Sequence, residues 1–283
     1  MGYKDDDKDS SKKYARICKY FGINPKELGD RLKLIEPIPE LMGGIIQVYN
    51  NNPSSVRDLI MTEMQDLNCW IKKDNNLICG INRSVNDVLD IISNIEYKFF
   101  PFSKNDKDQE CYFHIENAGF RLITMWDVLA QIFNLYFNID EPIYRIKYKE
   151  LFKKENVKHI NVNNRYEGKD LDSINNTLKK YFLDICLYLD ENISYDEKTL
   201  KCYGNHKYLS EDRNSFTHRK NPHEFSILHS DKNRNQLTLP DAPLYIVKRL
   251  IEDYMFLYDY TYRLLKVYWI YFDAFGIKPK IYK

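Results

Sequence analysis

The stretch that decides the fold is FRLITMWDVLAQIFNLYFNID, which runs from Phe120 to Asp140. Large apolar side chains recur in it at three- and four-residue spacing. They stand at Leu122, Trp126, Leu129, Phe133 and Tyr136. This spacing follows the 3.6-residue turn of an α-helix and gathers the apolar side chains on one face. The stretch therefore predicts a long amphipathic helix that packs into a core.

Two further helices are expected before this stretch. The run Asn52-Pro53-Ser54-Ser55 is a helix start signal, and apolar periodicity continues from it to about Lys73. A second apolar stripe begins after Ser84, which we expect to cap a separate helix. Residues 11–52 are expected to be irregular, apart from a short helix that could begin at Pro25. The charged segment 101–110 is predicted to be a loop.

Two more helices are expected after it. One starts near Asp170, and the last covers the stretch that begins at Asp241. In that last helix Asp241 is the expected N-cap and Pro243 stands just inside the first turn. Strand signals are few, so the sequence predicts an all-α protein, a bundle of four to five long helices. The apolar face of the last helix is broad enough to suggest a dimer.

Composition limits the class of protein. The 283 residues suit one large domain or two small ones, and 42 basic against 41 acidic side chains give a net charge of +1. A nucleic-acid surface would therefore have to be local. The six cysteines are scattered without a CxxC pair, which is typical of reduced thiols in the cytoplasm. No signal peptide and no membrane-spanning run is visible, so we expect a cytoplasmic protein without membrane contact.

We divide the chain into three parts. Residues 1–10 include GYKDDDKD, which looks like an epitope tag one aspartate short and is left out of the fold reasoning. Residues 11–52 form an N-terminal extension, and residues 53–283 form the helical domain. Phosphate-binding, dinucleotide-binding, zincin and α/β-hydrolase signatures are absent from the sequence.

One metal-site alternative stays open at this point. Cys111 and His114 are three residues apart, and Cys202 and His206 are four apart. Together they could supply a Cys2His2 zinc site, although the pairs are about ninety residues apart and no further signature accompanies them. We expect no metal and no cofactor.

The stretch EDRNSFTHRKNPHEF, Glu211 to Phe225, carries the residues with the clearest chemistry. Arg213 stands five residues before His218, with Asn214 directly after the arginine. A histidine near neutral pKa can move protons, and an arginine presents a charged planar fork to phosphate oxygens. The pair suffices in principle to cleave RNA through its own 2′-hydroxyl, without a metal. Spacing alone is weak evidence, because a histidine near a helix C-terminus is also favoured by the helix dipole.

The combination resembles the HEPN superfamily, whose ribonuclease members carry R-x4-6-H with a polar residue often following the arginine. Here the motif is Arg213-Asn214-Ser-Phe-Thr-His218, and it stands before the last long helix. The segment MWDVLAQIFNLYF is similar to a helix of standalone clostridial-type members. The resemblance covers roughly residues 53–275. It implies an all-α fold and a dimeric, metal-independent endoribonuclease.

The resemblance also implies roles for residues. Arg213 and His218 would be catalytic, and Asn214 would assist them. Further substrate contacts are assigned, with weaker support, to Thr217, Arg219 and His223. The implied partners are an RNA substrate, a second copy of the chain, and an antitoxin or other regulator in a toxin–antitoxin or phage-defence role.

Two departures from the family accompany this. The chain is nearly neutral, so an RNA groove would need a local basic strip, for which the candidates are Lys147, Lys149, Lys153, Lys154 and Lys158. Such a run is more often a solvated face. The chain is also long for a minimal HEPN domain. The alternative function is a non-catalytic HEPN module that dimerises and binds a nucleotide or a partner protein.

Overall fold

The structure is a computed structural model, and it is mostly helical, as the sequence predicts. It describes residues 23–39, 54–94, 96–99, 105–136, 146–160, 171–196, 198–199, 201–217, 223, 226–229, 235–238 and 240–273. The long helices are α4 (Ser54–Ser93), α5 (Asp106–Tyr136), α7 (Leu171–Leu189), α8 (Asn205–Thr217) and α9 (Pro243–Asp273). Shorter helices are α2 (Pro25–Leu32), α6 (Tyr148–Leu151) and the 3-10 helix η3 (Lys154–His159).

The chain divides into two compact units. Unit 1 contains Met1–Ile35, Gly80–Arg121 and Glu191–Tyr254. Unit 2 contains Glu36–Cys79, Leu122–Asp190 and Met255–Lys283. The helices α4, α5 and α9 each contribute one part to each unit, so the division does not follow the order of the sequence.

The helices α4 and α5 are longer than the sequence suggests. The two helices expected on either side of residues 74–83 are one continuous helix, α4. Its apolar positions Ile71, Ile78, Ile81 and Val85 are all buried, so one face carries the helix across the expected break. The predicted loop 101–110 is also wrong in its second half, because α5 begins at Asp106 with acidic residues in its first turn.

The two helices expected after α5 are confirmed, with one correction. α7 begins at Leu171, beside the expected start, and α9 begins at Pro243. Asp241 is not the N-cap of α9, because the Ala242 carbonyl accepts the first helical hydrogen bonds, from the amides of Tyr245 and Ile246. The carboxylate of Asp241 instead accepts a hydrogen bond from the Tyr208 hydroxyl.

The broad apolar face of α9 is buried within the chain itself. Its residues are buried along most of its length in each unit, from Leu244 to Tyr254 and from Leu257 to Tyr268. The positions left exposed include Asp259, Arg263 and Lys266. This helix therefore gives no separate indication of a dimer face.

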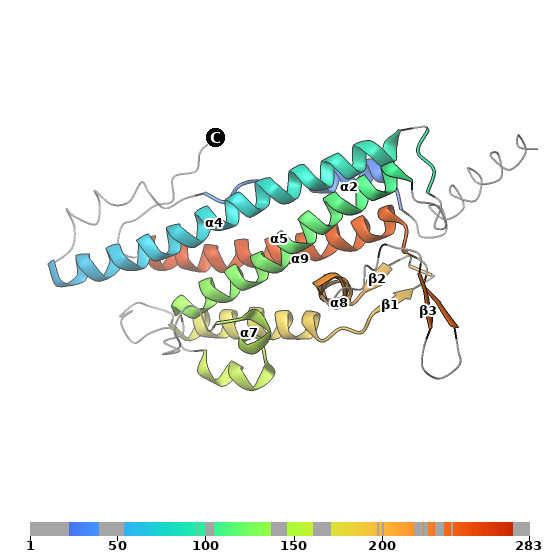
Figure 1. Ribbon diagram of the computed structural model, residues 1–283. Helices are drawn as coiled ribbons and strands as arrows, with labels where there is room; N and C mark the ends of the chain where they lie inside the picture. Colours follow the sequence, from blue (N-terminus) through green and yellow to red (C-terminus); the bar gives the residue numbers. More distant parts are fainter. Residues whose placement is uncertain are drawn as a thin grey trace, which may run out of the picture. The chain divides into compact units, whose positions relative to one another are not determined.

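Unit 2 is built on aromatic packing. Trp126 on α5 is completely buried and stacks against Tyr188 of α7 and Phe256 of α9, with ring centroids 6.1 and 6.2 Å away. Tyr188 and Phe256 stack on each other at 3.7 Å. The described apolar side chains that predicted α5 therefore belong to the core of unit 2. In the same unit the 3-10 helix η3 lies against α7 (Figure 1).

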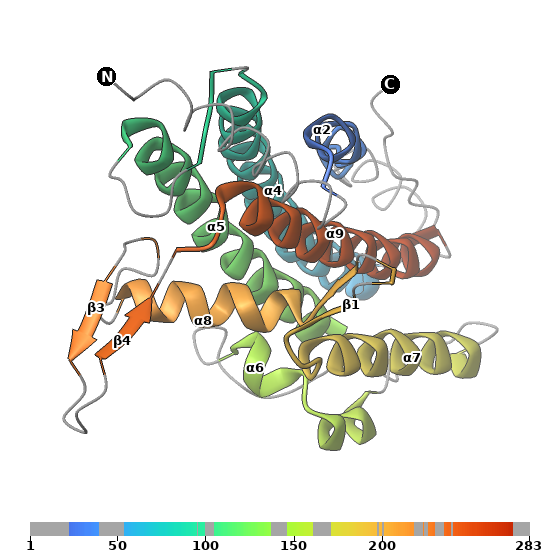
Figure 2. The same cartoon turned by 90° about the vertical axis from the view of Figure 1, so that its right-hand side faces the viewer.

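Unit 1 adds two short β-hairpins to its helices. β1 (Ser194–Asp196) pairs antiparallel with β2 (Lys201–Tyr203), and β3 (Ser226–His229) pairs antiparallel with β4 (Asn235–Thr238). The sequence did not indicate these strands. The first hairpin leads directly into α8, and the second follows α8 in the chain (Figure 2).

In unit 1 the short helix expected at Pro25 is confirmed as α2. Its N-cap is Asn24, whose side-chain oxygen accepts a hydrogen bond from the Lys26 amide at 3.0 Å. Within the described part of the chain, no helix is long and apolar enough to span a bilayer. The tag-like residues 1–10 and most of the extension 11–52 lie outside the described residues.

Candidate functional site

The helix that carries Arg213 is positioned by a glycine turn. Gly204 joins β2 to α8 with φ of 65°, in the left-handed region that favours glycine. A Cβ at this position would meet the backbone of Asn192 and Ile193 at 2.6 Å. The Gly204 amide donates to the Glu191 carboxylate at 3.1 Å, which fixes the turn at the start of the helix.

The buried face of α8 is fastened to α9 by polar contacts. His206 Nδ1 lies 3.2 Å from the Asp253 carboxylate, with both side chains almost fully buried. The Asn205 amide group donates to Glu252 at 3.0 Å. Because buried polar groups are costly without partners, these contacts specify one placement of α8 on the first half of α9.

Arg249 of α9 contacts the N-terminal part of α8. Arg249 is 1% exposed, and its guanidinium carbon lies 4.7 and 4.8 Å from the ring centroids of Tyr208 and Tyr245, whose planes are nearly perpendicular. It donates hydrogen bonds to the Tyr203 carbonyl and the Asn205 side-chain oxygen at 3.1 and 3.0 Å. A planar guanidinium suits this site, because its weakly hydrated faces can contact aromatic rings while its in-plane N–H groups donate hydrogen bonds.

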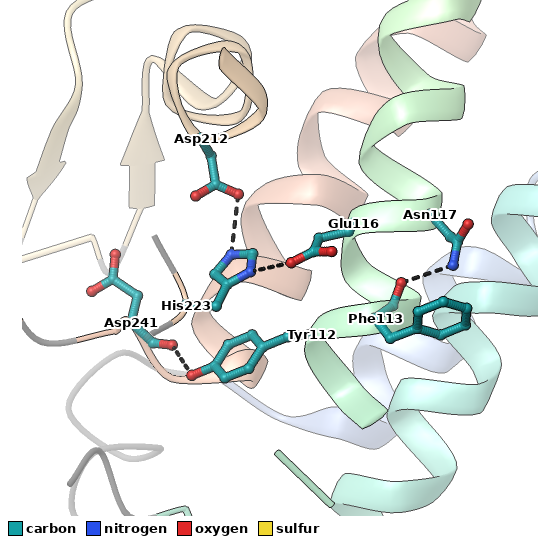
Figure 3. A network of polar contacts seen from close by, with 7 residues as sticks. All are labelled: Tyr112, Phe113, Glu116, Asn117, Asp212, His223 and Asp241. Atoms are coloured by element: carbon teal, nitrogen blue, oxygen red, sulfur yellow. Dashed lines mark hydrogen bonds and ion pairs between the residues drawn. The ribbon is translucent and has the colours of Figure 1, made fainter. Parts of the chain in front are cut away.

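The most unusual cluster of unit 1 surrounds His223. Its Nδ1 lies 2.8 Å from the Glu116 carboxylate of α5, and its Nε2 lies 3.2 Å from the Asp212 carboxylate of α8 (Figure 3). The ring stacks on Tyr112, with centroids 4.5 Å apart and planes 5° from parallel. The Tyr112 hydroxyl donates to the Asp241 carbonyl at 2.9 Å, just before α9 begins. One histidine therefore lies at the junction of α5, α8 and the approach to α9.

This environment holds the His223 ring protonated. Burial by itself lowers the pKa of the imidazole, but the contacts of its two nitrogens with the Asp212 and Glu116 carboxylates more than offset this. The result is a pKa raised to about 9. The side chain is 3% exposed, and both ring nitrogens face carboxylates. Both nitrogens of the ring are thus engaged by contacts within the protein.

Arg213 and Asn214 lie on the outer side of α8 near its C-terminal end. Both are exposed. The Arg213 guanidinium carbon lies 5.8 Å from the centroid of the Phe120 ring on α5, within the range of a cation–π contact. Phe120 follows Glu116 by one helical turn, so consecutive turns of α5 face Asp212 and Arg213. The arginine therefore combines solvent access with an aromatic contact to its guanidinium group.

The structure describes the other predicted site residues only in part. His218 and Arg219 lie outside the described residues, and Thr217 is the last residue of α8, whose side chain is not described. The five lysines of the expected basic strip are all exposed in unit 2. Lys153 and Lys154 form ion pairs with Glu150 and Asp190, so part of this strip's charge is neutralised.

The alternative zinc site is not formed. His114 pairs with Asp87 at 3.5 Å, and His206 pairs with Asp253. Cys111, His114, Cys202 and His206 are all described, and the described residues include no group of three or more His, Cys, Asp or Glu side chains arranged to hold a metal ion. The paired spacings of the sequence therefore do not converge on one point.

Sequence reasoning missed the residues that surround the motif. Tyr112 and Glu116 are one helical turn apart on α5, and Asp212 directly precedes Arg213, but nothing in the pattern connects them to His223. The only available signal was the density of polar residues around Pro222. The contact between positions 116 and 223 depends on the fold.

No family model, curated protein or solved structure gives a significant match to this chain. The site must therefore be interpreted from its own geometry.

Proposed function

We propose that this protein is a metal-independent endoribonuclease of the HEPN type, acting as a dimer of helical bundles. The observation that carries the proposal is the exposure of Arg213 and Asn214 together on α8, on the outer side of a helix that is otherwise fixed by buried contacts. A rigid helix with an exposed arginine offers a positioned cation to a phosphate. The second support is the motif Arg213-Asn214-Ser-Phe-Thr-His218, which resembles that of HEPN ribonucleases.

Each motif residue has one role in this proposal. The Arg213 guanidinium binds the non-bridging oxygens of the scissile phosphate and stabilises the charge that develops on them. His218 moves the protons, and Asn214 donates a hydrogen bond that orients the same phosphate. The Phe120 ring of α5 lies in cation–π range of the guanidinium and restricts its position.

The reaction balances without a metal or a cofactor. The 2′-oxygen attacks the adjacent phosphorus as its proton is removed, and the bond from phosphorus to the 5′-oxygen breaks. The leaving 5′-oxygen takes up a proton. The products are a 2′,3′-cyclic phosphate and a 5′-hydroxyl. A toxin or phage-defence role would follow from cleavage of cellular RNA.

The test is cleavage of a mixed-sequence RNA by the full-length protein in EDTA. We expect cyclic-phosphate and 5′-hydroxyl ends from the wild type, and a loss of about 100-fold or more in rate for His218→Ala and Arg213→Ala, since each removes a transition-state interaction. Matched controls are His159→Ala and Arg263→Ala, which remove an exposed histidine and an exposed arginine from unit 2. Both controls should cleave as the wild type does.

Cleavage that survives in pure His218→Ala would refute the assignment of the histidine. A wild type that cleaves no RNA, but loses a partner or its dimeric state in the Arg213 variant, would point instead to the non-catalytic HEPN module. Sedimentation of the wild type at several concentrations measures the dimer directly.

A further inference from the structure

We propose that His223 is a positioning residue of the α8 site: its imidazolium joins Asp212 on α8 to Glu116 on α5 and so fixes the turn that presents Arg213 and Asn214. The joining is a property of the fold of unit 1. Its consequence for RNA cleavage rests on the proposed function.

The geometry favours an anchor because three different elements meet at one ring. Asp212 and Glu116 approach the two nitrogens at 3.2 and 2.8 Å, and Tyr112 covers one face of the ring. The carboxylate side chains are 17% and 18% exposed, so water weakens these ion pairs little. Such a two-sided contact restricts both the distance and the angle between α5 and α8 in unit 1.

The position of the anchor links it to the arginine. Asp212 precedes Arg213 directly, and Glu116 precedes Phe120 by four residues on α5. The two contacts between the helices, Asp212–His223–Glu116 and Arg213–Phe120, are therefore consecutive along α5. Releasing the first would let the last turns of α8 move, and the guanidinium would lose its fixed position.

The charge of the anchor also matters for a polyanionic substrate. Asp212 and Glu116 would place two negative charges close to Arg213. These carboxylates would repel a phosphate that approaches the arginine. The imidazolium reduces this charge locally. A neutral ring would have only one N–H for two carboxylates, so one nitrogen lone pair would face a carboxylate oxygen. The anchor therefore needs the protonated form.

The groups that face His223 set its pH response. They are Asp212 from α8, Glu116 and Tyr112 from α5, and, through the Tyr112 hydroxyl, the Asp241 backbone before α9. An unrestrained histidine titrates near 6.5, whereas the pKa of His223 is raised to about 9. Between these two values the closed state keeps a proton that an opened state loses. The stabilisation is complete below pH 6.5 and is lost as pH rises toward 9.

The experiment is amide hydrogen exchange of α8 in the full-length wild type between pH 6 and 10, corrected for the intrinsic exchange rate. We expect protection of residues 205–217 to fall by up to about tenfold per pH unit between pH 6.5 and 9, and to level off above. His223→Gln should have low protection at pH 6.5 and no such pH step. Ring NMR of the wild type should show a histidine titrating near 9, shifted downward in Asp212→Asn.

The matched control is His114→Gln, which removes a histidine that is 21% exposed from the same helix α5. It should keep both the protection and its pH step. On RNA, His223→Gln should lower kcat by about 10- to 100-fold with a smaller change in KM, because binding survives while the catalytic geometry is lost.

The outcomes separate the two proposals. Protection of α8 that is independent of pH in the wild type, with no histidine titrating above 8, would overturn the anchor even if RNA is cleaved. A wild type that shows the step but cleaves no RNA would keep the anchor and refute the ribonuclease. If His223→Gln does not fold, the wild-type exchange and NMR curves still decide the question.

Discussion

The two units differ in the kind of side chain that they bury. Among the described residues, the buried ionisable side chains of unit 1 are Asp108, His206, His223, Lys248, Arg249 and Asp253. In unit 2 the described residues include a single buried ionisable side chain, Asp74. Apolar packing stabilises without regard to direction, whereas a buried ion pair requires one geometry. The difference indicates that buried polar contacts fix the relative orientation of the helices in unit 1, whereas apolar packing stabilises unit 2.

The strongest test of this contrast is Trp126→Ala in unit 2. The indole is completely buried among Tyr188, Phe256 and Tyr148, so its removal loses transfer free energy and leaves a cavity. We expect the free energy of unfolding to fall by about 3–5 kcal/mol in urea denaturation. Trp70→Ala, at a half-buried position of α4, should cost much less. Equal losses in the two variants would contradict the assignment of Trp126 to the core.

A second test replaces the central cation of unit 1. Arg249→Met keeps the volume of the side chain but leaves the Tyr203 carbonyl and the Asn205 side-chain oxygen without their donor. We expect a loss of about 2–4 kcal/mol in the free energy of unfolding, because buried acceptors lose their hydrogen bonds.

Arg249→Lys should recover little of this loss, since a single ammonium lacks the planar fork that contacts Tyr208 and Tyr245 while donating to two separate acceptors. Arg263→Met is the control. That arginine is 46% exposed and pairs with Asp259 one turn away, so we expect a change within about 0.5 kcal/mol. An Arg249→Met variant as stable as the wild type would mean that the polar contacts of unit 1 are not needed for its stability.

The sequence predicted the helices of both units because their signal is periodic and local. The stripe through Trp126 identified α5, and the Asp170 and Pro243 starts identified α7 and α9. The break expected between Lys73 and Ser84 is wrong, because the apolar face of α4 continues through the cap-like residue Ser84. A serine inside a helix does not end it when both flanking turns are buried.

The candidate site was less predictable, because its contacts join residues far apart in the chain. Arg213 and Asn214 could be selected from the motif, and the structure exposes both. His223 was assigned to the substrate, yet its partners include Glu116, which stands 107 positions earlier. No local pattern encodes that contact. It depends on how α5 and α8 pack within unit 1.

The smallest expected effect sharpens the comparison, because it concerns the exception in unit 2. Asp74 on α4 is 1% exposed, and its Oδ2 has no hydrogen-bond partner among the described residues. Burial raises the pKa of this carboxyl to about 8. Between pH 3.8 and 8 the folded state therefore holds a proton that the unfolded state releases, so wild-type stability declines as pH rises through this window.

Asp74→Asn removes the titration while keeping the shape of the protonated carboxyl. We expect it to gain about 1–2 kcal/mol over the wild type at pH 8, and to show little difference at pH 4, where the wild-type carboxyl is already neutral when folded. Urea titrations at the two pH values measure this. Asp66→Asn, at an exposed position on the same helix, is the control without a pH-dependent gain. A loss of stability in Asp74→Asn at pH 8 would show that the carboxylate is stabilised as an anion, and unit 2 would then also use buried charge for orientation.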